Sequence, residues 1–221
     1  MTDHFAILTV LLTSFFLNSS LQVSTTALKS LNGWSADENA FAYGLPGSVA
    51  PIEKFDPLGF ANGATLGEVK RYREAEVTHG RVAMLAALGF LTGENFHPLF
   101  GLEGTELLAV DSLAEVRAVF PLFFELLVVV ISTTEVYRAL CGWTRPNAVT
   151  GVASGDLLVE DYYPGDINFD PAGLKPEDAD EFATMQTKEL QNGRLAMLGI
   201  AGMVAQELVD HLPILKNDFG I

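Results

Sequence analysis

Two segments of the chain place an acidic residue, a residue with a neutral donor side chain and an arginine at the same spacing. The residues are Glu76, His79 and Arg81 in EVTHGRVAMLAALGF, and Glu189, Asn192 and Arg194 in ELQNGRLAMLGIAGM. Seven of the fifteen aligned positions are identical at a constant offset of 113 residues. Five residues along a helix turn two side chains about 140° apart, so the Glu and the Arg of one segment cannot pair. Two crossing copies would pair reciprocally, which predicts the interhelix ion pairs Glu76–Arg194 and Glu189–Arg81.

The His and the Asn follow the paired Glu by three residues and lie on the same helix face. Each offers a single donor atom in an apolar sequence, and a carboxylate paired with Arg keeps a free lone pair. Such single axial donors suit a magnesium ion whose other positions are filled by a tetrapyrrole, because magnesium prefers hard ligands. The alternative is an interhelical hydrogen bond, but the repetition favours the pigment. Glu135 and Gln206 are further single donors in apolar segments.

Three apolar stretches of membrane-spanning length, about 73–92, 118–138 and 186–209, hold these residues. A charge in mid-membrane costs roughly 3 kcal/mol on insertion scales, so charges there need partners and mark function. Nine basic residues lie at or beyond one end of the stretches, and only Arg117 and Lys216 lie beyond the other. This asymmetry obeys the positive-inside rule. The sequence predicts an all-α membrane protein with three transmembrane helices, of which the first and third cross as a pseudo-twofold pair.

The repeat includes turns and small residues. Phe55-Asp56-Pro57-Leu58-Gly59 recurs as Phe169-Asp170-Pro171-Ala172-Gly173, and an Asp-Pro step suits a tight entry turn. The small residues Gly80, Ala83, Ala86 and Gly89 match Gly193, Ala196, Gly199 and Gly202. Small residues let membrane helices approach closely, and they also leave flat surfaces for a planar ring or a polyene.

Composition limits the classes of function. The chain has 221 residues, 13 basic against 28 acidic, a net charge of −15 and 49% apolar residues, with a mean hydropathy of +0.27. An acidic surface argues against nucleic acid as a partner, because phosphate backbones require a Lys/Arg excess. A single cysteine, Cys141, excludes an internal disulfide framework and a cysteine-based metal site. Charge and hydrophobicity must therefore be segregated along the chain.

The first forty residues have the composition of a targeting sequence. Residues Phe5 to Leu17 form an apolar run of signal-peptide length, and residues 18–36 are rich in Ser and Thr without any acidic residue. We expect residues 1–40 to be a bipartite signal and transit segment for a plastid reached through the secretory route. Residues 41–221 would form the functional domain.

The motifs together resemble a known family. They are GLPG (44–47), FDPLGF (55–60), EVTHGRVAML (76–85), YYPGDINFDPAGLKP (162–176) and KELQNGRLAML (188–198). From about Tyr43 to Asp210 the chain is similar to the chlorophyll a/b and fucoxanthin–chlorophyll a/c light-harvesting proteins. EVYRALCGW (135–143), YYPGD and AGMVAQELVD (201–210) are more similar to the algal stress-related branch, which serves photoprotection more than light capture.

The resemblance implies a set of pigment sites. The ligands of chlorophyll magnesium would be Glu76, His79, Glu135, Glu189, Asn192 and Gln206, and the sites would also include Arg81, Arg138, Lys188 and Arg194. The pigments would be chlorophyll a, a second chlorophyll, with c favoured over b, and a xanthophyll of the fucoxanthin or diadinoxanthin type near the two Phe-Asp-Pro turns. Leu127 replaces a frequent family Gln, and His211 follows Gln206 too closely to match the family's last His, so neither is assigned a pigment.

The resemblance also implies a location and partners. The protein would be a non-enzymatic antenna of the plastid thylakoid membrane, with its N-terminus in the stroma, beside photosystem I or II cores and other antenna proteins. Its oligomeric state is left open. We expect a lumenal pH sensor among the acidic residues Glu103, Glu106, Asp111, Glu115 and Asp210, because carboxylates with raised pKa values would protonate on acidification. A solvated polar loop is the alternative for each of them.

Two other classes of protein share parts of the pattern. Glu-x-x-His on a helix is half of a di-iron carboxylate site, but that fold needs two such helices and two further Glu-bearing helices. A pigment-free stress protein that only packs helices would explain the small residues. Absorption of the purified protein separates the three: chlorophyll and carotenoid bands, an iron–oxo band, or neither.

Overall fold

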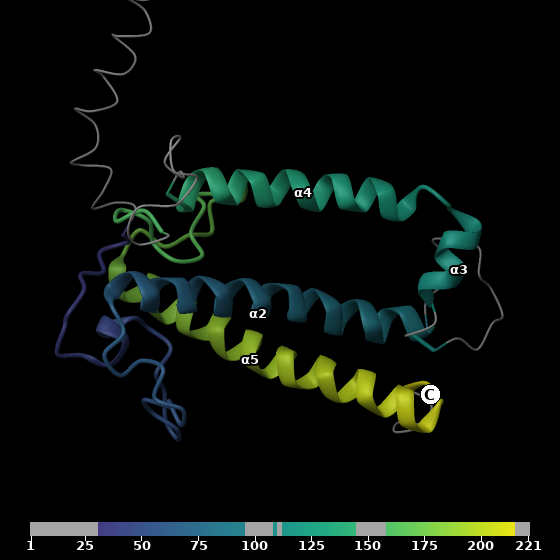
Figure 1. Cartoon of the computed structure of the whole chain (residues 1–221), viewed down its shortest axis with the longest axis horizontal. Coiled ribbons are helices and arrows are strands. Elements are labelled where there is room, and N and C mark those ends of the chain that lie inside the picture. Colours follow the sequence, from purple (N-terminus) through teal and green to yellow (C-terminus); the bar gives the residue numbers. More distant parts are fainter. Residues whose placement is uncertain (1–30, 96–107, 110–111, 145–157, 215–221) are drawn as a thin grey trace, which may run out of the picture.

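The part of the chain that the computed structural model describes, residues 31–95, 108–109, 112–144 and 158–214, is built from helices (Figure 1). A short 3-10 turn, η1 (Phe41–Gly44), precedes α2 (Leu66–Asn95), α3 (Ser112–Val119), α4 (Phe123–Gly142) and α5 (Ala179–Asp210). These ranges contain no β-strand, only an isolated bridge between Trp143 and Leu158. The predicted helical class is therefore confirmed for the described residues. Of the predicted targeting segment, residues 1–40, the first thirty residues lie outside the described ranges.

Both long helices begin at sequence-encoded caps. Thr65 and Glu68 form a capping box at α2, in which the Glu68 carboxylate accepts from the Thr65 N–H at 2.8 Å and Thr65 Oγ1 accepts from the Glu68 N–H at 3.3 Å. The Asp178 side chain accepts the N–H groups of Asp180 and Glu181 at the start of α5. Because of these caps, α2 and α5 begin seven residues before the apolar stretches predicted at 73–92 and 186–209.

The middle stretch requires a correction. The sequence predicts one segment over 118–138, but the chain breaks between α3 and α4, which begins at Phe123 and continues to Gly142. Pro121 explains the break, since proline lacks the N–H that a continuous helix would use and disfavours helical backbone at Phe120. Hydropathy alone does not mark any of the described helices as long and apolar enough to cross a membrane.

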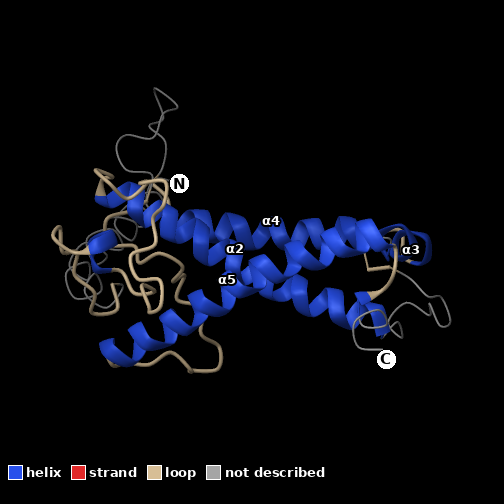
Figure 2. Cartoon of the chain, turned by 90° about the horizontal axis from the view of Figure 1, so that it is seen from below, coloured by secondary structure: helices blue, strands red, loops and turns tan. Residues whose placement is uncertain are grey.

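Helices α2 and α5 cross and make the main interhelix contact of the described chain (Figure 2). At the crossing a Cβ added to Gly80 would lie 3.0 Å from the Gly193 Cα, so only glycine allows this approach. The other repeated glycines, Gly89, Gly199 and Gly202, face open space and do not pack helix on helix. Close packing by small residues, which the sequence predicts along the whole stripe, is thus centred on Gly80 and Gly193.

Most of the described loops lie at one end of the helix bundle. The starts of α2 and α5 and the end of α4 lie together, and α3 lies at the opposite end (Figure 1). The loops at the first end enclose a small core in which Tyr163 makes edge contacts with Trp34 and Phe182 at ring distances of 5.9 and 5.5 Å. Apolar side chains of α4, from Leu126 to Ile131, are instead 40–62% exposed. The chain therefore buries its loop core and leaves an apolar helix surface uncovered.

The two Phe-Asp-Pro turns have matching hydrogen bonds. The Asp56 carboxylate accepts the N–H groups of residues 60 and 61, and the Asp170 carboxylate accepts those of residues 174 and 175. In both turns the carboxylate therefore bonds the fourth and fifth residues that follow. Gly59 and Gly173, three residues after each Asp, have positive φ angles of 72° and 64°. The tight turns expected from the Asp-Pro steps are present.

Candidate functional site

Two ion pairs join α2 and α5 across their crossing. Arg194 Nε and Nη2 each lie 2.7 Å from Glu76 Oε1, and Arg81 Nε lies 2.7 Å from Glu189 Oε1. Both reciprocal pairs expected from the repeat are thus present. The hydrogen bonds engage Oε1 of each carboxylate, so Oε2 is the atom that could bind a further cation; Glu76 Oε2 also lies 3.4 Å from Arg73 Nη1.

Each arginine has a second partner, a backbone carbonyl in a Pro-Gly turn. Arg194 Nη1 donates to the Gly47 carbonyl at 2.7 Å, and Arg81 Nη1 donates to the Gly165 carbonyl at 2.8 Å. A Cβ on Gly47 would lie 2.7 Å from Leu190 Cδ1, and a Cβ on Gly165 would lie 2.8 Å from Val77 Cγ1. Both glycines have positive φ angles, of 111° and 84°. The two turns therefore hold the two guanidinium groups in the same way.

Sequence reasoning did not connect these turns, although a signal exists. Leu-Pro-Gly ends at Gly47 and Tyr-Pro-Gly ends at Gly165, and each precedes a Phe-Asp-Pro turn. The intervals differ, because Gly47 lies eight residues before Phe55 and Gly165 lies four residues before Phe169. A repeat search at constant offset misses such a pair, whereas a search that allows a short insertion would find it.

His79 and Asn192 are held by equivalent bonds to their own helices. His79 Nδ1 lies 2.7 Å from the Ala75 carbonyl oxygen, and Asn192 Nδ2 donates to the Lys188 carbonyl at 3.0 Å. A carbonyl only accepts, so Nδ1 has the hydrogen and Nε2 of the neutral imidazole has the lone pair. In the Asn the same arrangement leaves Oδ1 as an acceptor. Both side chains are exposed, so each presents one donor atom on the helix surface.

Glu135 on α4 belongs to a larger polar cluster. Its Oε2 accepts from Arg138 Nη2 at 2.6 Å and Nε at 3.1 Å, and its side chain is 51% exposed. Arg138 Nη1 donates to Thr78 Oγ1 at 2.8 Å and to Glu74 Oε1 at 3.2 Å. Arg138 therefore links the exposed carboxylate on α4 to a buried carboxylate on α2.

Glu74 is the centre of this cluster and was not predicted. Its side chain is 2% exposed, and Oε2 accepts from the Tyr162 hydroxyl at 3.0 Å and the Gly165 N–H at 2.5 Å. Burial, and then the Glu74 charge, raise the pKa of Tyr162. The counterpart of Glu74 in the second segment is Thr187, so the repeat gives no signal for it. A Glu two residues before the repeated Glu was the only hint.

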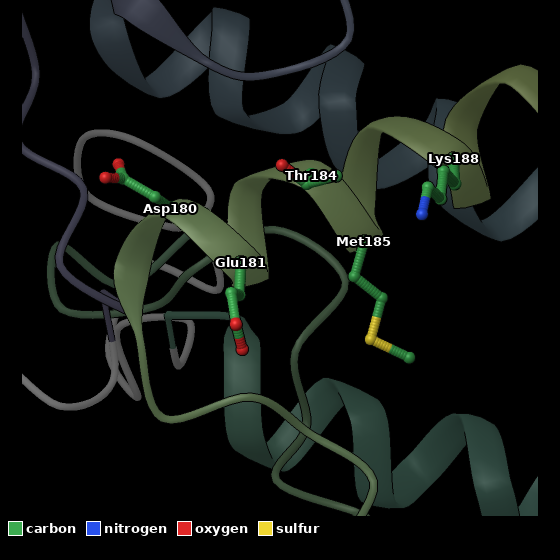
Figure 3. A pocket seen from close by; sticks show the side chains of 5 residues that line it. All are labelled: Asp180, Glu181, Thr184, Met185 and Lys188. Atoms are coloured by element: carbon green, nitrogen blue, oxygen red, sulfur yellow. The ribbon is translucent and has the colours of Figure 1, made fainter.

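The remaining predicted residues lie along α5. Figure 3 shows Lys188 projecting from the N-terminal part of α5. It lines an open depression of about 450 Å³ together with Asp180, Glu181, Thr184 and Met185. Gln206 is partly buried near the other end of the helix. The structure therefore does not bring Lys188 and Gln206 together with the crossing.

Most of the expected pH-sensing residues lie outside the part of the chain that the structure describes. Glu103, Glu106 and Asp111 lie outside the described residues, as does the side chain of Glu115, and Asp210 is the exposed last residue of α5. Among the described residues, the buried carboxylates at this end are two others. Glu207 is 1% exposed and accepts the Ala109 N–H at 3.0 Å, and Glu94 is 8% exposed and accepts the Ile214 N–H at 3.0 Å.

The described side chains do not form a cluster that could hold a metal ion by itself. Within the described ranges, no three His, Cys, Asp or Glu side chains gather as they would around a metal ion. A di-iron centre therefore has no site in this part of the chain. The site therefore offers separate single ligands: carboxylates paired with arginine, and the neutral side chains of His79 and Asn192.

Comparison with known proteins decides the family. The model of the family described as "Chlorophyll A-B binding protein" matches residues 41–208. The chain belongs to this family. Light-harvesting complex stress-related protein 3.2 of Chlamydomonas reinhardtii is 47% identical over 188 residues, which cover 82% of this chain and 70% of that protein. The fucoxanthin-chlorophyll a-c binding protein of Isochrysis galbana is 47% identical over 175 residues, which cover 79% and 81%.

Within the chlorophyll-binding family the chain is nearer to these algal proteins than to a plant one. A chlorophyll a-b binding protein of Petunia hybrida is 31% identical over 174 residues, which cover 74% of this chain and 61% of that protein. The resemblance stated from the motifs, including that to the stress-related branch, is confirmed. These relatives are named for pigment binding and light harvesting, not for an enzymatic activity.

Proposed function

We propose that this protein binds chlorophylls and xanthophylls in the thylakoid membrane, harvests light and dissipates excess excitation. The observation that supports this best is the matched pair His79 and Asn192. One polar side-chain atom of each residue hydrogen-bonds the carbonyl four residues earlier. The other polar atom is on the exposed surface, next to a neutralised Glu–Arg pair. A neutral donor beside a neutralised carboxylate fits the axial coordination of a chlorophyll magnesium.

The donor set fits six chlorophyll ligands. Nε2 of the His, Oδ1 of the Asn, the second carboxylate oxygens at the crossing, Glu135 and Gln206 would hold the magnesium ions; the full set is Glu76, His79, Glu135, Glu189, Asn192 and Gln206. Arg81, Arg138 and Arg194 neutralise the carboxylates, and Lys188 lies beside the depression on α5. When bound, chlorophyll supplies the light-absorbing ring; the chain fixes where each ring lies.

Uncovered apolar surface supports the same proposal. The outward side chains Val82 and Leu85 on α2 and Leu195 and Leu198 on α5 are 62–75% exposed, like those of α4. Pigment rings, polyenes and lipid are the apolar partners that would cover them. The exposed Phe55 and Phe169 of the two turns would contact the ends of xanthophylls that lie on the small-residue surfaces.

We further propose that α2, α4 and α5 are three transmembrane helices, with α2 and α5 related by a pseudo-twofold axis and the N-terminus in the stroma of the plastid. Basic residues are concentrated at the end where α2 and α5 begin; they include Lys70, Arg71, Arg73, Arg138, Lys175 and Lys188. Glu94, Glu207 and Asp210 lie at the opposite end. This asymmetry supports the proposal that the basic end lies in the stroma.

The relatives support a choice of pigments and partners. Higher identity to a fucoxanthin-chlorophyll a-c binding protein than to a chlorophyll a-b binding protein favours chlorophyll c over b as the second chlorophyll. It also favours a xanthophyll of the fucoxanthin or diadinoxanthin type. Photosystem cores and other antenna proteins would receive or exchange the excitation.

Dissipation would respond to lumenal pH. The candidate sensors are Glu103, Glu106, Asp111 and Glu115, which lie in the sequence between α2 and α4, and Asp210, the last residue of α5. Replacing all five by their amides should weaken acid-induced fluorescence quenching of the pigment-loaded protein. Unchanged quenching would remove these residues from the proposal.

The ligand assignment is tested by exchanging the two halves of the repeat. We expect His79→Leu to lose one chlorophyll per chain after reconstitution with pigments, and His79→Asn to keep it, because Asn serves at the matching position 192. Asn192→Leu should lose one chlorophyll and Asn192→His should keep it. Pigment extraction with absorption spectra provides the count. Equal chlorophyll content in the Leu variants and the unaltered chain would contradict the assignment.

A further inference from the structure

The two carboxylates at the crossing have different charged neighbours. Glu76 contacts Arg194 at 2.7 Å and also Arg73, whose Nη1 lies 3.4 Å from Glu76 Oε2. The residue that matches Arg73 113 positions later is Gln186, which is neutral. Among the described residues, the one ion pair of Glu189 is with Arg81.

Arg73 is a buried cation, not a surface charge that swings away into solvent. Its side chain is 9% exposed, and Nη1 makes no hydrogen bond within the described part of the chain. The backbone at Gly47 covers it so closely that a Cβ there would lie 2.8 Å from Nη1. A charge held at a fixed place away from water acts on its neighbours with little screening.

Gln186 is buried as well but is engaged differently. It is 6% exposed, and its side-chain oxygen accepts a hydrogen bond from the Tyr163 hydroxyl. Both positions are thus enclosed, and what differs between them is charge. The group Glu76, Arg73 and Arg194 has a formal charge of +1, whereas the group Glu189 and Arg81 is neutral.

We propose that Arg73 is a positioning residue that acts through Glu76 and makes the two crossing pigments unequal in absorption energy. The proposal rests on the proposed function, in which Glu76 and Glu189 each ligate a chlorophyll. A carboxylate shared by two guanidinium groups donates less electron density to magnesium than one held by a single guanidinium. The net positive charge of the group Glu76, Arg73 and Arg194 also acts on the ring itself. Two halves of matching backbone geometry thereby acquire an energy difference, which sets a direction for excitation transfer.

The experiment uses the full chain reconstituted with chlorophylls and xanthophylls and its absorption at low temperature. Glu76→Ala and Glu189→Ala identify the band of each pigment by its loss. We expect Arg73→Gln to shift the band that Glu76→Ala removes, to leave the other band in place, and to keep the number of chlorophylls per chain. Arg73→Lys, which retains the charge, should leave both bands in place.

The converse variant tests the cause. Gln186→Arg puts a cation at the matching place and should shift the Glu189 band in the sense opposite to the Arg73→Gln shift. A purely structural role of Arg73 would change pigment content or stability in both Arg73 variants and would not predict this opposite shift. If Arg73→Gln fails to load pigment, Arg73→Lys and Gln186→Arg still decide the proposal.

Three results would overturn the inference: unchanged bands in Arg73→Gln, an equal shift in Arg73→Lys, or no shift in a loaded Gln186→Arg chain. Failure of the proposed function looks different. In that case the unaltered chain would bind no chlorophyll, or Glu76→Ala and Glu189→Ala would each retain every chlorophyll.

Discussion

Each arginine at the crossing is satisfied by a carboxylate and a backbone carbonyl. Arg81 bonds Glu189 and the Gly165 carbonyl, and Arg194 bonds Glu76 and the Gly47 carbonyl. A buried charge that loses its partner is costly, whereas a paired and hydrogen-bonded one is tolerated. The arrangement allows four charges to lie inside an apolar segment.

The ion pairs should show energetic coupling. In a cycle of Arg81→Gln, Glu189→Gln and the double variant, we expect a coupling energy of about 0.5–1 kcal/mol if the pair stays as exposed as in the chain alone, 45% and 32%, and about 1–3 kcal/mol once pigment or detergent covers it. The measurement is thermal loss of helix by circular dichroism in detergent. Glu181→Gln, an exposed change on the same helix, should have almost no effect. Additive single effects would contradict the pairing.

Asp166 should stabilise the loop core in a pH-dependent way. Burial raises the pKa of Asp166, but the hydrogen bonds from Lys175, Asn32 and the Asn168 N–H outweigh it and hold the pKa below its ordinary value of 3.8. A lowered folded pKa gives stability that is fully present above pH 3.8 and is lost as the pH falls through the folded value.

The matched variant is Asp166→Asn. The difference in melting temperature between the unaltered chain and Asp166→Asn should be constant above about pH 5 and should shrink below about pH 4. Circular dichroism melts across this range provide the test. A difference that does not change with pH would show that the charge of Asp166 contributes nothing.

At the level of single residues, the sequence could predict those site residues that occur in both copies of the repeated motif. His79, Asn192 and both ion pairs follow from two copies of one pattern, whose chemistry explains why matched groups recur. Glu74 has no counterpart, since residue 187 is Thr, and its role depends on Tyr162 and Arg138, which are distant in sequence. A buried carboxylate with partners from two other segments cannot be found from local spacing.

Among elements, the crossing of α2 and α5 depends on one glycine contact. The sequence predicts both helices from their apolar stretches and the repeated motif. It could not say which of the repeated small residues meet, because that depends on where the helices cross. Gly80 and Gly193 meet, and Gly89 and Gly202 do not.

Substitution at the crossing should therefore be far more costly than substitution elsewhere on the stripe. We expect Gly80→Ala or Gly193→Ala to destabilise the bundle by about 1–3 kcal/mol, because the added methyl group would overlap the opposing backbone. Gly89→Ala and Gly202→Ala add the same methyl group in open space and are the matched controls for helix propensity. Thermal melts compare the four. Equal effects at all four positions would contradict the crossing geometry.

The end of α4 shows a different limit of sequence reasoning. Hydropathy placed the middle segment at 118–138, but Pro121 and the bridge between Trp143 and Leu158 set its true limits. Hydropathy averages over a window and cannot locate a backbone break of one residue. The cluster around Glu74 then attaches α4 to α2 through polar contacts, which apolar periodicity does not report.

At the scale of the whole molecule, the opposed charge distribution and the uncovered apolar helix surface belong together. A chain with a net charge of −15 has 49% apolar residues, and many of the large ones are exposed along the helices. Pigments and lipid would cover these surfaces and would also complete the coordination that His79 and Asn192 present. Pigment binding would therefore explain both features of the molecule together.

The most direct measurement is the absorption spectrum of the purified full chain, followed by pigment extraction. The account predicts chlorophyll and carotenoid bands in the unaltered chain, and two chlorophylls fewer per chain in the double variant His79→Leu, Asn192→Leu. A folded chain without chlorophyll bands, or a double variant with undiminished chlorophyll, would contradict it.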